Sequence, residues 1–177
     1  TNVHFDTALR GFRAEYFASD VFTNPVLWRV DQEINFDYQD QAPVRTLLKP
    51  DKFSVRWTGW LTLPQATTAT WFLATDDGSR LFINNELVID HWGVHGKEEK
   101  TAITPLSAGE HAVRIDYYEN LGWAAAHVEW QPHSGARTYA VPVRALPAAR
   151  AALAIRARQT DRLGNVSAHT TPLQLSR

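Results

Sequence analysis

The 177-residue sequence contains no Cys and no Met, and neither sign of charge is in marked excess. The lack of Cys excludes disulfide bonds and thiolate metal sites. With 18 basic and 19 acidic residues, the formal net charge of -1 gives no electrostatic basis for binding nucleic acid or an anionic membrane. No apolar run is long enough to span a bilayer, and nothing resembles a signal peptide. Because a chain without Met cannot begin at its own initiator, we expect a mature product or a fragment of a longer multidomain chain.

Runs of alternating apolar residues, rich in aromatic and β-branched side chains, recur along the chain and are typical of strands. They are FRAEYF (12–17), FSVRWTGWLTL (53–63), ATWFLAT (69–75), SRLFINNELVI (79–89), HAVRIDYY (111–118) and AAAHVEW (124–130). Asn84-Asn85 predicts a tight hairpin turn, because Asn tolerates positive φ. Residues 147–157 have a helix-forming composition, but the tail of this segment, LAIRARQ (153–159), also alternates, so periodicity does not decide its structure. The pattern favours an all-β antiparallel sandwich.

Two adjacent carboxylates, Asp76 and Asp77, stand between a strand pattern and Gly78. Like charges repel and a strand would point them to opposite faces, so we expect that a nearby group requires both. Calcium takes about six to eight oxygen ligands, and two carboxylates would largely neutralise it while leaving positions for sugar hydroxyls. A DDGS tetrad is also ordinary turn chemistry, with Asp side chains accepting backbone hydrogen bonds. Taken alone, the tetrad favours the turn.

Several blocks follow one another in order along residues 11–130: GFRAEYF, WRVDQEINFDY, FSVRWTGWL, FLATDDGSRLFINNELVIDHW, LSAGEHAVRIDYYENLG and VEW. Together they resemble the β-sandwich domain named for the amino-terminal fragment of anthrax protective antigen. Domains of that family occur in bacterial toxins, adhesins, glycosidases and yeast flocculins, and flocculin-like and bacterial-adhesin members are calcium-dependent lectins. Other members bind no sugar or serve as structural inserts, so the fold does not fix the function.

The resemblance implies a calcium site. In lectin members the peptide between the paired aspartates is cis, which brings both carboxylates onto one ion. The corresponding pair here is Asp76 and Asp77, so the resemblance implies a cis bond between them. A later loop supplies an Asn side-chain oxygen and backbone carbonyls, and here these positions correspond to Asn120, Leu121 and Trp123. This loop is shorter than its counterpart in flocculins. The predicted metal ligands are therefore Asp76, Asp77, Asn120, Leu121 and Trp123, and the predicted ion is Ca²⁺.

Trp123 allows two interpretations. Its ring could stack on the C–H patches of a sugar beside the calcium site, or fold back over the end of the sandwich. The other tryptophans considered, Trp57, Trp71 and Trp130, lie within strand patterns and are interpreted as packing residues.

The segment DHWGVHGKEE contains two histidines at four-residue spacing, His91 and His95. Gly93 and Gly96 argue against a helix, so the shared face of a zinc-binding helix is absent and no zinc site is predicted. We expect the two histidines to border the sugar pocket. The charged run GKEEK (96–100) is interpreted as a solvated loop.

An enzyme is not predicted. Glycosidases use two separated carboxyls, one of them protonated, whereas neighbours on one metal would both be ionised. The sequence has no GxSxG, no HExxH and no glycine-rich phosphate loop. Asp116 and Glu119 are further carboxylates for which the sequence offers no activating partner.

Two domains of unequal size are expected: the sandwich at residues 1–131, and a C-terminal extension at 132–177 that forms an added hairpin or a junction to a next module. The predicted function is a calcium-dependent carbohydrate-binding module of a secreted or cell-surface protein. Its predicted sugar-binding residues are Asp76, Asp77, Trp123, His91 and His95, and its predicted partners are glycans or cell-surface polysaccharide. The alternative is a structural or spacer sandwich in a larger surface protein or glycosidase.

Overall fold

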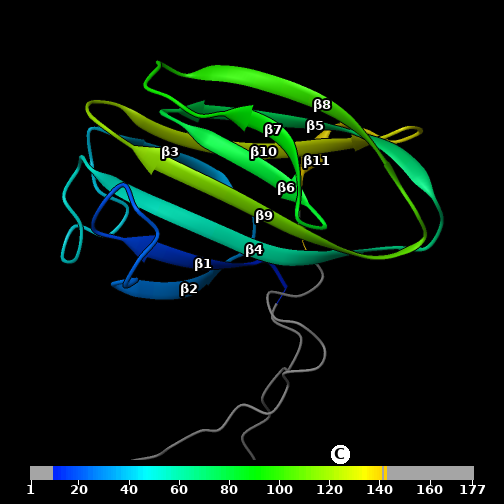
Figure 1. Ribbon diagram of the computed structural model, residues 1–177, viewed down its shortest axis with the longest axis horizontal. Coiled ribbons are helices and arrows are strands. Elements are labelled where there is room, and N and C mark those ends of the chain that lie inside the picture. Colours follow the sequence, from blue (N-terminus) through cyan, green and yellow to red (C-terminus); the bar gives the residue numbers. More distant parts are fainter. Residues whose placement is uncertain (1–9, 141, 143–177) are drawn as a thin grey trace, which may run out of the picture. The chain divides into compact units, whose positions relative to one another are not determined.

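The computed structural model describes residues 10–140 and 142 (Figure 1). Within that part of the chain the regular structure consists of strands alone. The strands are β1 (Phe12–Phe17), β2 (Leu27–Asp31), β3 (Asn35–Gln39), β4 (Phe53–Leu63), β5 (Thr67–Asp76), β6 (Ser79–Ile83), β7 (Glu86–His91), β8 (Glu98–Leu106), β9 (Gly109–Glu119), β10 (Ala124–Pro132) and β11 (Thr138–Tyr139). The segment 147–157, with its helix-forming composition, lies outside the described residues.

The strands form two antiparallel sheets, which confirms the predicted all-β sandwich (Figure 1). The first sheet has the order β2-β1-β4-β9-β6-β7. The second has the order β11-β10-β5-β8, with β3 also paired to β10. Because β5 and β6 belong to different sheets, the turn that joins them crosses from one sheet to the other at residues 77–78. The aspartate pair lies at this crossing.

The core lies between the sheets and is rich in aromatic residues. Trp57 on β4 and Trp71 on β5 come from different sheets, and both are fully buried. Trp130 is partly buried and packs against Trp71 at a ring-centroid distance of 5.8 Å. All three tryptophans are packing residues, as predicted, and burial of their large apolar surfaces is a major source of stability.

One carboxylate is built into this core. Asp31 is 7% exposed, and its Oδ2 accepts hydrogen bonds from the hydroxyl of Tyr16 at 2.7 Å and from Nε1 of Trp57 at 2.8 Å. Its Oδ1 accepts a hydrogen bond from Nε of Arg29 at 2.6 Å. Both oxygens of this buried carboxylate are therefore satisfied by protein donors, as buried polar groups require.

The predicted hairpin is confirmed at Asn84-Asn85, where φ is 52° and 69° and β6 turns into β7. The interpretation of GKEEK as a loop is wrong for its second half, since Glu98–Lys100 begin β8. Strand β8 is at the edge of its sheet. Charged side chains are common on edge strands because they remain in water and oppose edge-to-edge association, so a charge run does not exclude a strand there.

The sandwich includes residues after 131. β11 pairs with β10 through Glu129 and Tyr139, and Ala140 is fully buried in the core. The backbone N–H of Gly11 donates to the carbonyl of Pro142 at 2.9 Å, which joins the two ends of the sandwich. The proposed C-terminal extension stays a prediction, because residues 143–177 lie outside the described part.

Candidate metal and ligand site

The turn between β5 and β6 holds the aspartate pair. The Asp76-Asp77 peptide bond is cis, as the resemblance implied. On either side of the turn, the hydroxyls of Thr75 and Ser79 are buried and hydrogen-bonded to each other at 2.7 Å. A Cβ at Gly78 would lie 2.2 Å from Cε1 of Tyr118, so only glycine fits at this close approach. The turn is therefore fixed by its neighbours on both sides.

Asp77 ties the turn to two loops. Its side chain is nearly fully buried, with an exposed fraction of 2%. Its Oδ1 accepts a hydrogen bond from the backbone N–H of His95 at 2.8 Å, and its Oδ2 accepts one from the backbone N–H of Asn120 at 2.9 Å. Segments far apart in the sequence thus converge on one carboxylate.

Glu119 is a third carboxylate in the same place. Oxygen atoms of Asp76, Asp77 and Glu119 lie within 4.8 Å of one another. Glu119 is fully buried, yet its Oε1 has no hydrogen-bond partner. Its Oε2 lies 3.3 Å from the hydroxyl of Tyr117, which also donates to the carbonyl of Asp76 at 2.6 Å. The site is therefore a buried acidic cluster with one oxygen unsatisfied.

The electrostatics of the cluster follow from this crowding. Burial, followed by the charges of the neighbouring carboxylates of Asp77 and Asp76, raises the pKa of Glu119 to about 8. Burial, followed by the charge of Asp77, also raises the pKa of Asp76. Desolvation and like charges both disfavour the ionised carboxylate, whereas a cation at this point would favour it.

Glu119 was not among the site residues predicted from the sequence, although its position in the strand pattern carried a signal. Strand β9 alternates, and Val113, Ile115 and Tyr117 are buried on one of its faces. Two residues further along, Glu119 must point to that same buried face. Asp116, the other carboxylate considered, has a partner: it forms a two-point ion pair with Arg56 at 2.6 and 2.8 Å.

Asn120 adjoins the cluster, but its side chain is already engaged. Its Oδ1 accepts a hydrogen bond from Nζ of Lys52, and its carbonyl accepts one from the backbone N–H of Lys52 at 3.2 Å. The ammonium group of Lys52 is therefore hydrogen-bonded to Oδ1 of Asn120, the oxygen predicted to bind calcium. Next along the loop, the N–H of Gly122 donates to Oδ1 of Asp51 at 3.0 Å.

Trp123 is 66% exposed, so it does not fold back over the sandwich. It borders a cavity of about 280 Å³ that Asp76 also lines. The cavity is lined by Asp37, Gln39, Asp76, Lys97, Trp123, Ala124 and Ala125. Leu121 is 64% exposed on the same loop as Trp123. The structure thus brings Trp123 and one of the two aspartates to a common cavity, while the roles of the Leu121 and Trp123 carbonyls stay predictions.

The two histidines lie on the other side of Asp77. The rings of His91 and His95 are stacked, with a centroid distance of 3.7 Å and an interplanar angle of 14°. One ligand atom each from His91, His95 and Glu98 lies within 4.8 Å of the others, so a non-helical loop brings them together. Ring nitrogens bind metals in the ring plane, and nearly parallel planes do not converge on one point. Neither histidine is among the residues that line the cavity beside Trp123.

These features define a class of protein: an antiparallel β-sandwich with buried carboxylates gathered at the crossing between its sheets. A model of the PA14 domain family matches residues 10–143. The chain therefore belongs to the PA14 domain family, as the resemblance in the sequence indicated. Among the described residues, no helix has the length and apolar character needed to cross a membrane.

Two relatives of this chain are longer proteins, of which the match covers only a part. Over 125 residues the chain is 33% identical to the anti-sigma-I factor RsgI3 of Acetivibrio thermocellus, and the match covers 70% of this chain and 19% of that protein. An anti-sigma factor domain-containing protein from Clostridium clariflavum has a solved structure with 32% identity and a TM-score of 0.68, covering 73% of this chain and 44% of that one. The chain thus spans less than half of either relative.

A third similar structure is a PA14 sugar-binding domain from an RTX adhesin, with 21% identity and a TM-score of 0.60. The match covers 76% of this chain and 96% of that domain. At this identity the likeness supports the fold alone. None of these three names describes an enzyme.

Proposed function

We propose that this PA14 domain is a calcium-dependent carbohydrate-binding module. The observation that carries the proposal is the unpartnered Oε1 of Glu119, fully buried beside Asp76 and Asp77. An unsatisfied buried oxygen within a carboxylate cluster is costly unless a cation or water completes it. The oxygens of the cluster suit a hard cation, and calcium prefers such donors.

The residues that would hold the ion are Asp76, Asp77 and Glu119, with Asn120 joining if Lys52 releases its side-chain oxygen. Asp77 is kept in place by the N–H groups of His95 and Asn120. When bound, calcium supplies coordination positions for adjacent hydroxyl groups of a sugar. The chain itself orients the carboxylates and shields them from water on the core side.

The cavity beside the cluster suits a sugar. Trp123 offers an exposed aromatic face, and carbohydrate C–H groups pack on such faces. Across the lining, Lys97 Nζ donates to Oδ1 of Asp37 at 2.9 Å, which provides a donor and an acceptor for hydroxyl groups. Because this cavity is small, we expect its contact with a sugar to be shallow and the dissociation constant for the sugar to be at about the millimolar level. The adhesin domain described above, named as sugar-binding, is consistent with this proposal.

Calcium titration of the Asp77→Asn variant tests the ion site. The substitution keeps the size of the side chain and removes its charge, so we expect the calcium affinity to fall by about 100-fold or more. Asp90→Asn is the matched control, because Asp90 is an exposed carboxylate paired with Arg80 outside the cluster. Isothermal titration of both variants after chelation gives the comparison. Equal calcium binding by Asp77→Asn and the wild type would refute the assignment.

A glycan array, run once in calcium and once in chelator, tests the sugar site. We expect binding in calcium only, to sugars with accessible vicinal hydroxyls. Replacing the Trp123 ring by Ala removes the stacking surface but no proposed side-chain ligand, so sugar affinity should fall by about tenfold while calcium affinity stays unchanged. Loss of both affinities would show that the loop had collapsed, and loss of neither would remove Trp123 from the site.

The second candidate function is a spacer or structural sandwich in a longer protein. It is favoured by the two anti-sigma factor relatives, of which this chain covers less than half and whose names mention no sugar. A domain that binds no glycan in calcium, and whose melting temperature calcium does not raise, would support it. A secreted or cell-surface location belongs to the first proposal, by analogy with the adhesin domain.

A further inference from the structure

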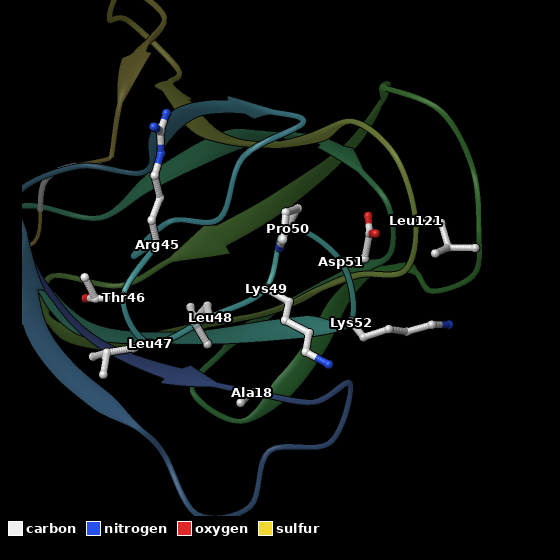
Figure 2. A pocket seen from close by; sticks show the side chains of 10 residues that line it. All are labelled: Ala18, Arg45, Thr46, Leu47, Leu48, Lys49, Pro50, Asp51, Lys52 and Leu121. Carbon is white, nitrogen blue, oxygen red and sulfur yellow. The ribbon is translucent and has the colours of Figure 1, made fainter.

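A second cavity lies beside the segment between β3 and β4, and Leu121 of the 120–123 loop also lines it. Its volume is about 660 Å³. Ten residues line it, mainly from the segment between β3 and β4: Ala18, Arg45, Thr46, Leu47, Leu48, Lys49, Pro50, Asp51, Lys52 and Leu121 (Figure 2). It shares none of them with the cavity beside Trp123. It is therefore a separate binding space.

The lining is cationic with an apolar floor. Arg45, Lys49 and Lys52 contribute three positive charges, and Asp51 is the single carboxylate in the lining. Figure 2 shows the Arg45 side chain pointing in a different direction from the side chains of Lys49 and Lys52. Among the described residues, Arg45 and Lys49 have no ion pair or hydrogen bond through their side chains. In a chain of net charge -1, this is a local excess of unpaired positive charge.

The segment that carries these cations is held in place. The N–H groups of Leu47 and Leu48 both donate to the carbonyl of Val44, at 3.0 and 2.9 Å. Leu48 is 6% exposed and belongs to the core, and Val44 packs against it. The exposed side chains of Arg45 and Lys49 therefore project from an anchored turn, so a ligand must order these side chains but not the backbone that carries them.

The cavity is also linked to the proposed sugar site. Lys52 and Asp51 contact the 120–123 loop through the bonds to Asn120 and Gly122. Leu121 lines the cationic cavity, while Trp123, two residues further on, lines the cavity beside Asp76. A polymer bound at the second cavity would pass over this short loop to reach the first.

We propose that the cationic cavity is a subsite for an acidic polysaccharide, one that carries carboxylate or sulfate groups on units next to the sugar held at the calcium site. The inference rests on the proposed carbohydrate function and names the class of glycan. Guanidinium and ammonium groups bind such anions through charge-assisted hydrogen bonds, and the leucines offer an apolar surface to the sugar ring. A neutral glycan would leave Arg45 and Lys49 unused.

The test compares three polymers in saturating calcium: dextran sulfate, polygalacturonate and neutral dextran, each immobilised for biolayer interferometry. We expect the wild type to bind at least one of the two polyanions about tenfold or more tightly than dextran, with weakening as salt rises. The polymer that binds more tightly identifies sulfate or carboxylate as the preferred group. In the double variant Arg45→Ala, Lys49→Ala this preference should disappear, while calcium affinity measured by titration stays unchanged.

The matched control is Arg13→Ala, Lys100→Ala, which removes two cations that are already paired with Glu15 and Glu98 outside the cavity. An equal loss in this control would show that general charge, rather than the cavity, attracts the polyanion, and would overturn the inference. A wild type that binds neutral glycans in calcium without preferring polyanions would overturn it while leaving the proposed function intact. A wild type that binds no glycan at all would overturn both.

Discussion

Two of the buried acidic groups in the described part of the chain have opposite surroundings. Asp31, in the core, accepts hydrogen bonds from Tyr16, Trp57 and Arg29, so both of its oxygens are satisfied. Glu119, at the crossing between the sheets, is equally buried but leaves one oxygen without a partner and lies among other carboxylates. The first arrangement is complete in the protein alone, whereas the second leaves an acceptor that the proposed cation would complete. The comparison separates an acid that stabilises the fold from the acids that we propose to bind the ion.

The largest expected effect is a difference in the free energy of unfolding between variants of Asp31 and Glu119. Asp31→Ala leaves a phenol, an indole N–H and a guanidinium without their acceptor, so the free energy of unfolding should fall by about 3 to 5 kcal/mol. Glu119→Gln replaces a carboxyl group whose ionised form is disfavoured by burial and by the neighbouring carboxylates, so in chelator it should cost little or even stabilise the domain. Urea denaturation of both variants in chelator gives the two values. Similar losses in the two variants would contradict the distinction.

An intermediate effect is expected in the pH dependence of stability without calcium. Burial raises the pKa of Glu119 from its ordinary 4.5 to about 8, so the folded state binds this proton more tightly than the unfolded state. The resulting stabilisation is complete below about pH 4.5 and is lost as the pH rises toward 8. Relative to Glu119→Gln, the melting temperature of the wild type in chelator should therefore fall by several degrees between pH 5.5 and 8.5.

The difference between the two pH profiles isolates Glu119 from other groups. The pKa of His91 is lowered by burial, so its protonation below about pH 6.5 destabilises the fold and acts in the opposite direction. Both proteins carry His91, and its contribution cancels. Parallel profiles for the wild type and Glu119→Gln would show that Glu119 is already ionised without calcium.

The smallest expected effect concerns Lys52, whose ammonium group engages the side-chain oxygen of Asn120. Lys52→Met frees that oxygen and removes a positive charge near the proposed ion, so calcium should bind about 3- to 10-fold more tightly. Lys49→Met is the matched control, because Lys49 lies in the same segment without a bond to Asn120. Calcium titrations on both variants are compared. Weaker binding in Lys52→Met would mean that Lys52 supports the loop rather than competing with calcium.

Much of the fold could be predicted from the sequence because period-two alternation and turn residues are local signals. The strands around Trp57 and Trp71 and the turn at Asn84-Asn85 were found in this way. Strand β8 was missed, since the charges of Glu98 and Lys100 fit either a loop or a sheet edge. Whether a charged segment pairs with a neighbouring strand depends on contacts distant in sequence, which a local pattern does not contain.

The candidate site could be predicted only in part for the same reason. The adjacency of Asp76 and Asp77 drew attention to them but favoured an ordinary turn, and the family resemblance gave both the calcium assignment and the cis bond. Glu119 joins them through the pairing of β9 with β6, in which Tyr117 faces Ser79. The engagement of Asn120 by Lys52 spans 68 residues of sequence and follows from no spacing rule. The positions of Glu119 and Lys52 at the site therefore depend on the tertiary structure and not on a sequence motif.

The hydrogen bond between Gly11 and Pro142 bears on how such a domain can be moved between proteins. The backbone enters and leaves the sandwich at one point, so the domain can interrupt the loop of a host protein without pulling the two sides of that loop apart. Folding of the host and folding of the insert then remain largely independent events. A gene segment encoding residues 10–143 is therefore a transferable unit, suited to internal fusion as well as to attachment at either end of another chain.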